Sequence, residues 1–495
     1  MNRQIVRLTY VALTLVAALV VMTSYWQAWA APGLAARQDN AIKRVAEFSI
    51  DRGVIFSFGP RKRLARNTER EVDGKPLYFR RYPQGELAAH VVGYSTVGRS
   101  RTGLERSLND YLTGATGNLA TLVDKALDEL RGKSVQGNDV VTTLDLDAQE
   151  VALEQLGSRC GAVFAFEART GRVKVMASTP SFDPNLVENR FGEISEITAD
   201  CRAPAPLVNR ASAGLYVPGS TFKVVTAAAA LESKEYTPES TFVDPGYCTV
   251  YGRRVNNFDT TRPFGTITLE DALAYSVNSV FCNIGLELGA KAILQQARRF
   301  GFYERPPLET PSEERLASGL YQRGQLYVPR VDADVDAGRM AFGQERMLVT
   351  AQQMAMVAGS IGVRGRLMEP HVVDRIVGPG GRLIFRQRPR LVRQAVSEET
   401  ADSIARMMRL AVAQGTGTAA QISGYAVGGK TGTGETGVPG SNTTWFLAFA
   451  GRDEETPAEL AIAVVLENQS GTGGSTAAPI ARAVMEAILR STENP

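Results

Sequence analysis

The sequence contains few histidines, and this shortage restricts the chemistry that it can support. Only two histidines occur in 495 residues, His90 and His371, and they lie far apart in the chain. Neither has the surroundings of a metal site or of a catalytic triad, which argues against a histidine-based zinc site and against a serine–histidine hydrolase. We therefore expect structural roles for both histidines, and neither a metal nor a cofactor.

Closely spaced cysteines, as in metal-binding or redox motifs, are also missing. None of the four cysteines belongs to a Cys-x-x-Cys motif, so zinc binding and thioredoxin-like redox chemistry are not expected. An even number of cysteines in an exported domain is compatible with two disulfides, for which three connectivities exist. We favour pairing of Cys160 with Cys201 and of Cys248 with Cys282. Free buried cysteines are the alternative.

The chain lacks a strong excess of either charge. Its formal net charge is +3, with 22% charged and 44% hydrophobic residues, which is ordinary for a globular protein. This balance gives no basis for nucleic-acid binding. The basic run at residues 61–63 is better explained as a solvated loop than as a binding patch. No internal repeat or low-complexity tract is present.

Long apolar runs are absent except at the N-terminus. Residues 8–29 are mostly apolar, and about 20 such residues are enough to cross a bilayer. Arg3 and Arg7 precede this run and predict a cytoplasmic N-terminus. We expect residues 1–30 to form a cytoplasmic stub and an uncleaved, single-pass anchor in the cell membrane, with the rest of the chain outside the cytoplasm. The alternative is a cleaved signal peptide, because residues 28–30 resemble an A-x-A site.

The remaining chain divides into two parts. Residues 31–139 are rich in Arg and Glu and predict a small α+β domain that ends at a turn-rich break. In residues 140–495, strands at both ends of a helical middle favour an α+β fold over a wound parallel sheet. The expected elements are a strand at 140–144, a helix at 145–156, a hairpin at 161–177, a buried alanine-rich helix within 211–231, strands at 445–450 and 460–466, and a closing helix at 479–489.

The clearest candidate for catalysis is a serine followed three residues later by a lysine. Ser220 and Lys223 would share one face of a helix that begins after the turn at 218–219. Free N–H groups at the start of that helix would stabilise an oxyanion formed when Ser220 attacks a carbonyl. Lys223 can act as the base only if its pKa falls through burial and nearby positive charge, which Lys430 could supply. Taken alone, the pair is also compatible with a capped, solvated helix start.

Two further motifs give this pair more weight. Ser276 and Asn278 form a Ser-x-Asn motif, and residues 430–433 read Lys-Thr-Gly-Thr. The three motifs in this order are the signature of penicillin-binding proteins and class A β-lactamases. Taken alone, the last motif could be a turn, because glycines flank it.

The similarity extends beyond the motifs to nearly the whole chain, and it is strongest after residue 140. The sequence resembles the class B penicillin-binding proteins, and in particular the penicillin-binding protein A type of actinobacteria. The other segments that carry the resemblance are 52–55, 103–105, 181–185, 209–211, 216–224, 445–446, 472–474 and 477–482. Two positions depart from the family pattern. Val217 replaces a second proline, which we expect only to soften the turn. Glu345 replaces a glycine, so we expect the loop backbone near the site to differ.

The resemblance implies a transpeptidase fold, an antiparallel sheet flanked by helices, which an N-terminal pedestal lifts off the membrane. In such a site Ser220 would be the nucleophile and Lys223 the base. Ser276 would carry a proton between Lys223 and the leaving amine. The backbone N–H groups of Ser220 and Thr433 would form the oxyanion hole.

The other motif residues would bind the substrate. Asn278 would hydrogen-bond the substrate amide backbone. Its side chain lies on the same side as that of the serine two residues earlier if the segment is an extended loop. Taken alone, the motif is also compatible with a helix turn that has a capping serine. Lys430, Thr431 and Thr433 would bind a terminal carboxylate. Gly432 would leave room for a substrate strand beside it.

The implied reaction is acyl transfer between peptidoglycan stem peptides. Ser220 would attack a D-alanyl-D-alanine carbonyl, and an amine of a neighbouring stem would take the acyl group. β-Lactams would acylate the same serine. Class B members lack a glycosyltransferase domain, so a separate SEDS-type membrane glycosyltransferase is the expected partner. A D,D-carboxypeptidase, a β-lactamase and a non-catalytic β-lactam receptor or scaffold remain as alternatives.

Overall fold

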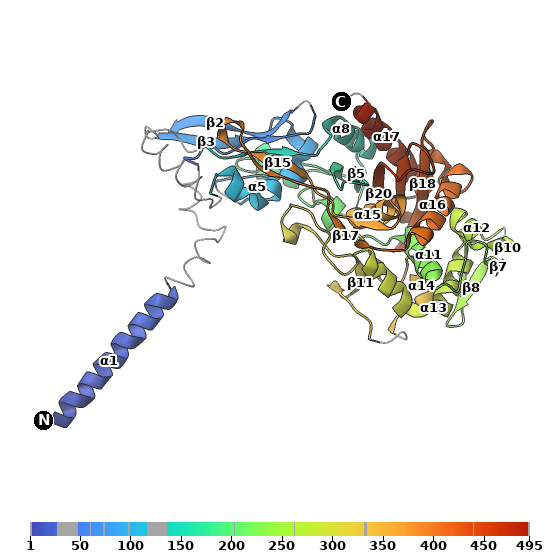
Figure 1. Cartoon of the computed structure of the whole chain (residues 1–495), viewed down its shortest axis with the longest axis horizontal. Helices are drawn as coiled ribbons and strands as arrows, with labels where there is room; N and C mark the ends of the chain where they lie inside the picture. Colours follow the sequence, from blue (N-terminus) through green and yellow to red (C-terminus); the bar gives the residue numbers. More distant parts are fainter. Residues whose placement is uncertain are drawn as a thin grey trace.

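The computed structural model describes residues 2–26 and 48–493, except for positions 60, 73–74, 98–99, 116–135, 202, 262, 331–333 and 439. These residues form an N-terminal helix, a small β-rich region and a larger region that mixes helices and strands (Figure 1). The α+β composition that the sequence predicts is confirmed.

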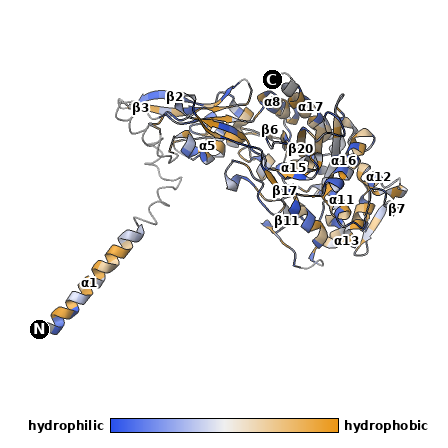
Figure 2. Ribbon diagram, viewed as in Figure 1, coloured by the Kyte–Doolittle hydropathy of each residue, from blue (hydrophilic) through white to orange (hydrophobic). Residues whose placement is uncertain are grey.

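Helix α1, Asn2–Ser24, is the candidate membrane anchor. Its span Arg3–Ser24 is long and apolar enough to cross a bilayer, and none of it is buried. Apolar residues follow one another along most of its length (Figure 2). The last residues of the predicted anchor and the signal-peptide motif at 28–30 lie outside the described residues.

A six-stranded sheet joins the N-terminal region to the rest of the chain. In sheet order its strands are β16 (Leu383–Arg386), β15 (Val373–Val377), β4 (Asp139–Thr142), β1 (Ile55–Phe56), β2 (Arg63–Val72) and β3 (Lys75–Arg81). β4 pairs in parallel with β1 and antiparallel with β15, so strands from both sides of residue 139 meet in one sheet. The predicted division into 31–139 and 140–495 therefore falls at the start of β4, and it remains a prediction.

A buried ion cluster stabilises the N-terminal region. Helix α5, Gly103–Ser107, carries Glu105, which is fully buried. Its carboxylate accepts hydrogen bonds from Arg52 Nε at 2.8 Å and from Arg80 Nε at 2.6 Å. Burial alone would raise the pKa of Glu105, but the two guanidinium groups outweigh burial and lower that pKa. The cluster thus links α5 to β3 and to the segment before β1.

A five-stranded antiparallel sheet forms the centre of the larger region. In sheet order its strands are β18 (Ala426–Val438), β19 (Ser441–Gly451), β20 (Leu460–Gln469), β5 (Gly161–Glu167) and β6 (Val173–Thr179). Helices cover both faces, so the inner strands are almost continuously apolar instead of alternating. In β19, Trp445 and Leu447 pack into the core that contains α15 (Ala351–Gly362), whereas Phe446 packs toward α17 (Gly473–Glu493). β18 lies at the edge of this sheet.

A mainly helical region follows β6 and precedes β18. Its helices next to the site are α11 (Lys223–Glu232), α12 (Leu269–Ala274), α13 (Asn278–Arg299) and α16 (Glu398–Ala413). Two small antiparallel sheets lie beside α12 and α13 (Figure 1). One pairs β7 (Thr241–Asp244) with β10 (Gly265–Thr268), and the other is the hairpin of β8 (Tyr247–Val250) and β9 (Arg253–Asn256). α11 is buried through Leu231, as its alanine-rich sequence predicts.

Most elements expected in the larger region are confirmed. α8, Leu146–Leu156, begins after Asp145, whose side chain caps the helix by accepting a hydrogen bond from Ala148 N. The hairpin is present as β5 and β6, and the two later strands lie within β19 and β20. The closing helix is longer than expected, because α17 begins at Gly473, before Pro479.

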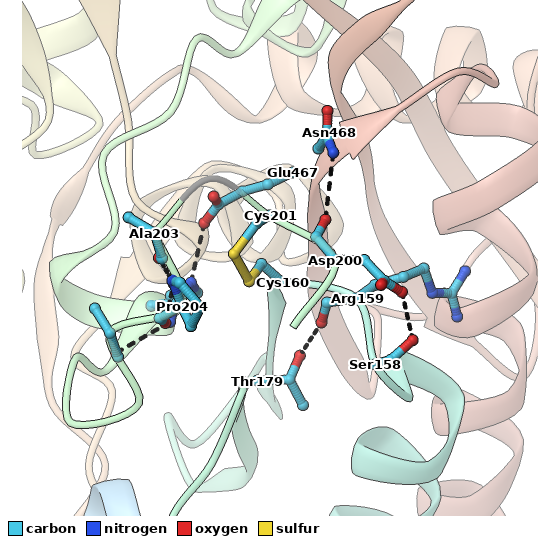
Figure 3. The surroundings of a disulfide bond; sticks show 12 residues. Ser158, Arg159, Cys160, Thr179, Asp200, Cys201, Ala203, Pro204, Glu467 and Asn468 are labelled. Carbon is cyan, nitrogen blue, oxygen red and sulfur yellow. Dashed lines mark hydrogen bonds and ion pairs between the residues drawn. A yellow bond between two sulfur atoms is a disulfide. The ribbon is translucent and has the colours of Figure 1, made fainter. Parts of the chain in front are cut away.

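Both predicted disulfides are present. Cys160 bonds Cys201, and Cys248 bonds Cys282, so the alternative of free cysteines is wrong. Figure 3 shows the first disulfide beside Glu467 at the end of β20. The second disulfide joins β8 to α13.

Candidate active site

Ser220 lies on a tight turn that precedes the alanine-rich helix. The prediction that Ser220 and Lys223 share one α-helix is wrong in detail. Gly219–Phe222 forms a 3-10 turn, and the α-helix begins at Lys223. Gly219 has a φ of +53°, and a side chain there would place its Cβ 2.4 Å from the carbonyl oxygen of Thr433. Only glycine therefore allows this turn to approach β18 so closely.

A cleft of about 1400 Å³ opens beside this turn. Six of the eight predicted site residues line it, and Lys223 and Lys430 are fully buried. The six are Ser220, Ser276, Asn278, Thr431, Gly432 and Thr433. The structure therefore brings together three motifs that are far apart in the sequence.

The Lys223 amine lies against the Ser-x-Asn motif. Its Nζ donates hydrogen bonds to the Ser276 carbonyl oxygen at 2.7 Å and to Asn278 Oδ1 at 2.7 Å, and it lies 3.3 Å from Ser276 Oγ. The motif does not lie in an extended loop, so that prediction is wrong. Ser276 has a φ of +63°, and Asn278 is the first residue of α13. Both side chains nevertheless reach the same amine.

Lys430 approaches the same serine from β18. Its Nζ donates to Ser276 Oγ at 2.8 Å and to the Thr431 carbonyl oxygen at 3.1 Å. Neither Lys430 nor Lys223 forms an ion pair with an acidic residue within the described ranges. The Ser276 hydroxyl thus lies between two buried amines that have no acidic partner in the described part of the chain.

Burial lowers the basicity of both amines, and the charge of Lys430 adds to this effect at Lys223. Burial lowers the pKa of Lys223 well below its usual value, and the positive charge of Lys430 lowers it further. Burial lowers the pKa of Lys430 to about 7. These are the two causes that the sequence analysis requires for Lys223 to act as a base.

The Lys-Thr-Gly-Thr segment is part of a strand and not a turn. It lies in β18 and pairs with β19 through its whole length. Thr431 Oγ1 lies 2.7 Å from Thr416 Oγ1. A Cβ at Gly432 would lie 2.6 Å from the carbonyl oxygen of Pro218, so glycine is required for contact with the nucleophile turn itself. This reason for Gly432 was not predictable from the sequence, because it depends on a contact between segments that are far apart in the chain.

Several other residues of the cleft were not predicted. They come from β9 and the loop after it, from the end of α12, from α14 (Ala337–Met340), from the segment before β18 and from the residue before α17, and no motif identifies them. Among them are Arg254, Asn257, Phe258, Phe264, Tyr275, Arg339, Thr416 and Thr472. The Gly-Thr-Gly-Thr run at 415–418 was the one available signal, since it contains Thr416.

The departure at Glu345 has a visible consequence. Glu345 lines the cleft with a φ of +53°, in a region where glycine is unstrained and a side chain is not. The preceding Gly343 has a φ of +79° and accepts a hydrogen bond at its carbonyl oxygen from Gly219 N. The loop thus keeps contact with the nucleophile turn while its backbone carries strain.

The four cysteines and the two histidines do not line the cleft. Cys160, Cys201 and Glu467 offer donor atoms close together, but the two sulfurs are bonded to each other (Figure 3). His90 and His371 are buried and do not line the cleft. Burial lowers the pKa of His90 to about 4, so it is neutral near pH 7.

Comparison with known proteins gives a consistent family. The model of the penicillin-binding protein transpeptidase domain matches residues 161–486, and that of the penicillin-binding protein A dimerisation domain matches 52–140. The chain is 31% identical to the peptidoglycan D,D-transpeptidase PbpA of Mycolicibacterium smegmatis, over 99% of both chains. It is 32% identical to PbpA of Mycobacterium tuberculosis, again over 99% of both.

Solved structures agree with this assignment. An imipenem acyl-enzyme complex of penicillin-binding protein A from M. tuberculosis superposes with a TM-score of 0.77 and 29% identity, over 90% of this chain and 100% of that one. The penicillin G acyl-enzyme complex of the same protein gives a TM-score of 0.76 and 29% identity, over 89% and 100%. This chain therefore belongs to the class B penicillin-binding proteins and is similar to penicillin-binding protein A of mycobacteria.

Proposed function

We propose that this chain is a peptidoglycan D,D-transpeptidase in which Ser220 forms the acyl-enzyme. One observation carries the proposal. Two buried lysine amines lie within 3.3 Å of a single hydroxyl, Ser276 Oγ, beside a cleft that Ser220 lines. A serine hydroxyl needs a base to become nucleophilic, and a desolvated lysine next to a second cation is neutral enough to be one.

In the acylation step, neutral Lys223 takes the proton of Ser220 as its oxygen attacks the carbonyl of the penultimate D-alanine. Across its contact with Ser276, the amine can then pass a proton toward the leaving D-alanine. Asn278 Oδ1 holds the Lys223 nitrogen in place during both transfers. The ester forms as the amide bond breaks, and the leaving amine departs with the transferred proton.

The developing oxyanion would lie between the backbone N–H groups of Ser220 and Thr433. The close approach of the Gly219 backbone to Thr433 in β18 supports this placement. Lys430, Thr431 and Thr433 would bind the terminal carboxylate. Asn278 and the edge of β18 would align the peptide, because an edge strand has free backbone groups for an extended ligand.

In the second step, an amine from a neighbouring stem attacks the ester and releases Ser220. Lys223 takes a proton from the attacking amine and passes it to the serine oxygen as the ester bond breaks, so a cross-link replaces the terminal D-alanine bond. A β-lactam would acylate Ser220 by the same first step and leave an ester that the cleft retains. The acyl-enzyme complexes of the similar mycobacterial protein support this reading.

We further propose that α1 anchors the enzyme with its N-terminus in the cytoplasm and its catalytic region outside. Arg3 and Arg7 at the start of the helix support this orientation. Residues 31–139 would then be the pedestal, and residues 140–495 the transpeptidase domain. The enzyme would have no glycosyltransferase activity and would work with a SEDS-type membrane glycosyltransferase.

Labelling with a fluorescent penicillin tests the function. We expect a stable adduct on the wild type and none on Ser220→Ala. Rapid loss of the label would indicate a β-lactamase, and absence of labelling would indicate a non-catalytic scaffold. An assay on stem-peptide substrate with an added amine acceptor separates the last alternative. Cross-linked product supports the transpeptidase, whereas hydrolysis alone supports the carboxypeptidase.

A further inference from the structure

A buried carboxylate outside the three motifs is connected to the active site. Asp244, at the end of β7, is 1% exposed and has no ion-pair partner in the described part of the chain. Its Oδ1 accepts hydrogen bonds from Gly246 N at 2.8 Å, Asn257 Nδ2 at 2.9 Å and Ser279 Oγ at 2.6 Å. Its Oδ2 accepts from Phe264 N and Asn257 Nδ2, both at 2.9 Å. A buried carboxylate without an ion-pair partner is costly, and these five hydrogen bonds offset that cost.

Two of the four residues that donate to this carboxylate belong to the wall of the cleft. Asn257 and Phe264 both line the cleft, and they begin and end the loop that also carries Phe258. Ser279 follows Asn278 directly in α13. One carboxylate thus holds both ends of the wall loop and the first turn of the helix that presents Asn278.

Hydrogen bonds on the neighbouring residues Asn256 and Asn257 connect Asp244 to the proposed catalytic base. Asn257, held by Asp244, accepts a hydrogen bond from Ser279 N at its Oδ1, at 3.0 Å. The neighbouring carbonyl of Asn256 accepts from Asn278 Nδ2 at 3.1 Å. This contact fixes which end of the Asn278 amide faces the cleft wall, so Oδ1 faces Lys223 Nζ at 2.7 Å.

A second link between the same elements does not replace this one. The disulfide between Cys248 and Cys282 joins β8 to α13 and limits how far they can separate. It makes no contact with the Asn278 amide, whose orientation depends on the Asn256 carbonyl. The disulfide therefore restrains the distance between the elements, whereas the carboxylate network sets the orientation of the side chain.

We propose that Asp244 is a positioning residue for acylation, which acts through Asn256 and Asn257 to hold Asn278 against the amine of Lys223. The proposal rests on the proposed function, because it requires that Lys223 act on Ser220. Asp244→Asn keeps the shape of the side chain. In either orientation, however, the NH2 group of the amide replaces a carboxylate oxygen and faces N–H or O–H groups that need an acceptor. The Asn257 segment then loses its fixed position.

The test measures the second-order rate constant for acylation by a fluorescent penicillin. We expect Asp244→Asn to lower it about tenfold or more, the effect of losing a buried hydrogen-bond partner. Ser279→Ala, which removes only one donor, is expected to lower it about threefold. Glu309→Gln is the matched control, because Glu309 is another mostly buried carboxylate that accepts from Val372 N and does not line the cleft. It should leave acylation unchanged even where it lowers the melting temperature.

A double-mutant cycle separates positioning from general destabilisation. If Asp244 acts through Asn278, then Asp244→Asn adds no further loss in an Asn278→Ala background. Independent, multiplying losses would overturn the proposal, and so would wild-type acylation by folded Asp244→Asn. If Asp244→Asn does not fold, Ser279→Ala takes its place in the cycle with Asn278→Ala, and the same two outcomes decide. Labelling of the wild type but not of Ser220→Ala tests the proposed function separately, so the two can fail independently.

Discussion

Replacing Lys430 by methionine should change the pH dependence of acylation. Lys430 and Lys223 both contact Ser276 Oγ, at 2.8 and 3.3 Å, with no acidic group paired to either in the described chain. The positive charge of Lys430 lowers the pKa of Lys223. Methionine keeps most of the volume and removes the charge, so the pKa of Lys223 rises toward the value that burial alone would give.

Coulomb's law gives the size of this effect. Two charges on the order of 5 Å apart, at an effective dielectric constant of about 20, repel by about 3 kcal/mol. Removing that repulsion makes Lys223 harder to deprotonate, which corresponds to about a hundredfold slower acylation at low pH, where the amine must lose its proton to act. The two amines of the wild type titrate as a coupled pair, and the reactive form has one proton between them. The acylation rate of the wild type should therefore rise and then fall as the pH increases. In the variant only the rise should remain, and it should occur at higher pH.

The assay is the acylation rate with a fluorescent penicillin, measured across pH from about 5 to 10, a range that spans the Lys430 pKa of about 7. The substitution also removes the proposed contact between Lys430 and the carboxylate of the penicillin. This loss would lower the acylation rate at every pH, but it would not move the rising limb of the pH profile. Lys174→Met is the control, since Lys174 is equally buried but pairs with Glu167 at 3.2 Å and does not line the cleft. If the rising limb of Lys430→Met stays in place or moves to lower pH, the charge of Lys430 does not lower the pKa of Lys223.

Three further predictions concern stability and backbone geometry. Glu345→Gly should raise the free energy of unfolding by about 1 kcal/mol, because glycine relieves the backbone at φ +53°. Glu345→Ala should not raise it. Equal gains for the two variants in chemical denaturation would contradict the presence of backbone strain. Gly219→Ala should abolish penicillin labelling while the far-UV spectrum is kept, because its Cβ would lie 2.4 Å from a carbonyl oxygen of β18; normal labelling would contradict it. Glu105→Gln should destabilise the N-terminal region by about 3 kcal/mol, because it leaves two buried arginines without their carboxylate, and unchanged thermal unfolding would count against the cluster.

Local sequence patterns predicted the elements that depend on nearby residues. The helix after Asp145, the hairpin of β5 and β6 and the alanine-rich α11 follow from capping, alternation and composition. The three motifs identified the site residues because their chemistry requires fixed residue types at short spacing. The disulfide pairing was also predicted correctly.

Features that depend on distant contacts were not predictable. The 3-10 turn at Ser220 and the φ of +63° at Ser276 arise where the turn meets β18 and where α12 meets α13. Thr416 and Asp244 have no motif, and only the folded chain brings them to Thr431 and to the Asn278 network. The sheet order, with β18 to β20 beside β5, pairs segments from opposite ends of the domain, which no local pattern encodes.

In the proposed mechanism, Ser220 becomes acylated because neutral Lys223 removes its proton. Mass mapping of the penicillin adduct, compared between wild type and a folded Lys223→Met variant, tests it most directly. We predict one adduct per wild-type chain, located on Ser220, and no detectable adduct on the variant within the same time. An adduct on another residue, or equal labelling of Ser220 in the variant, would contradict the account.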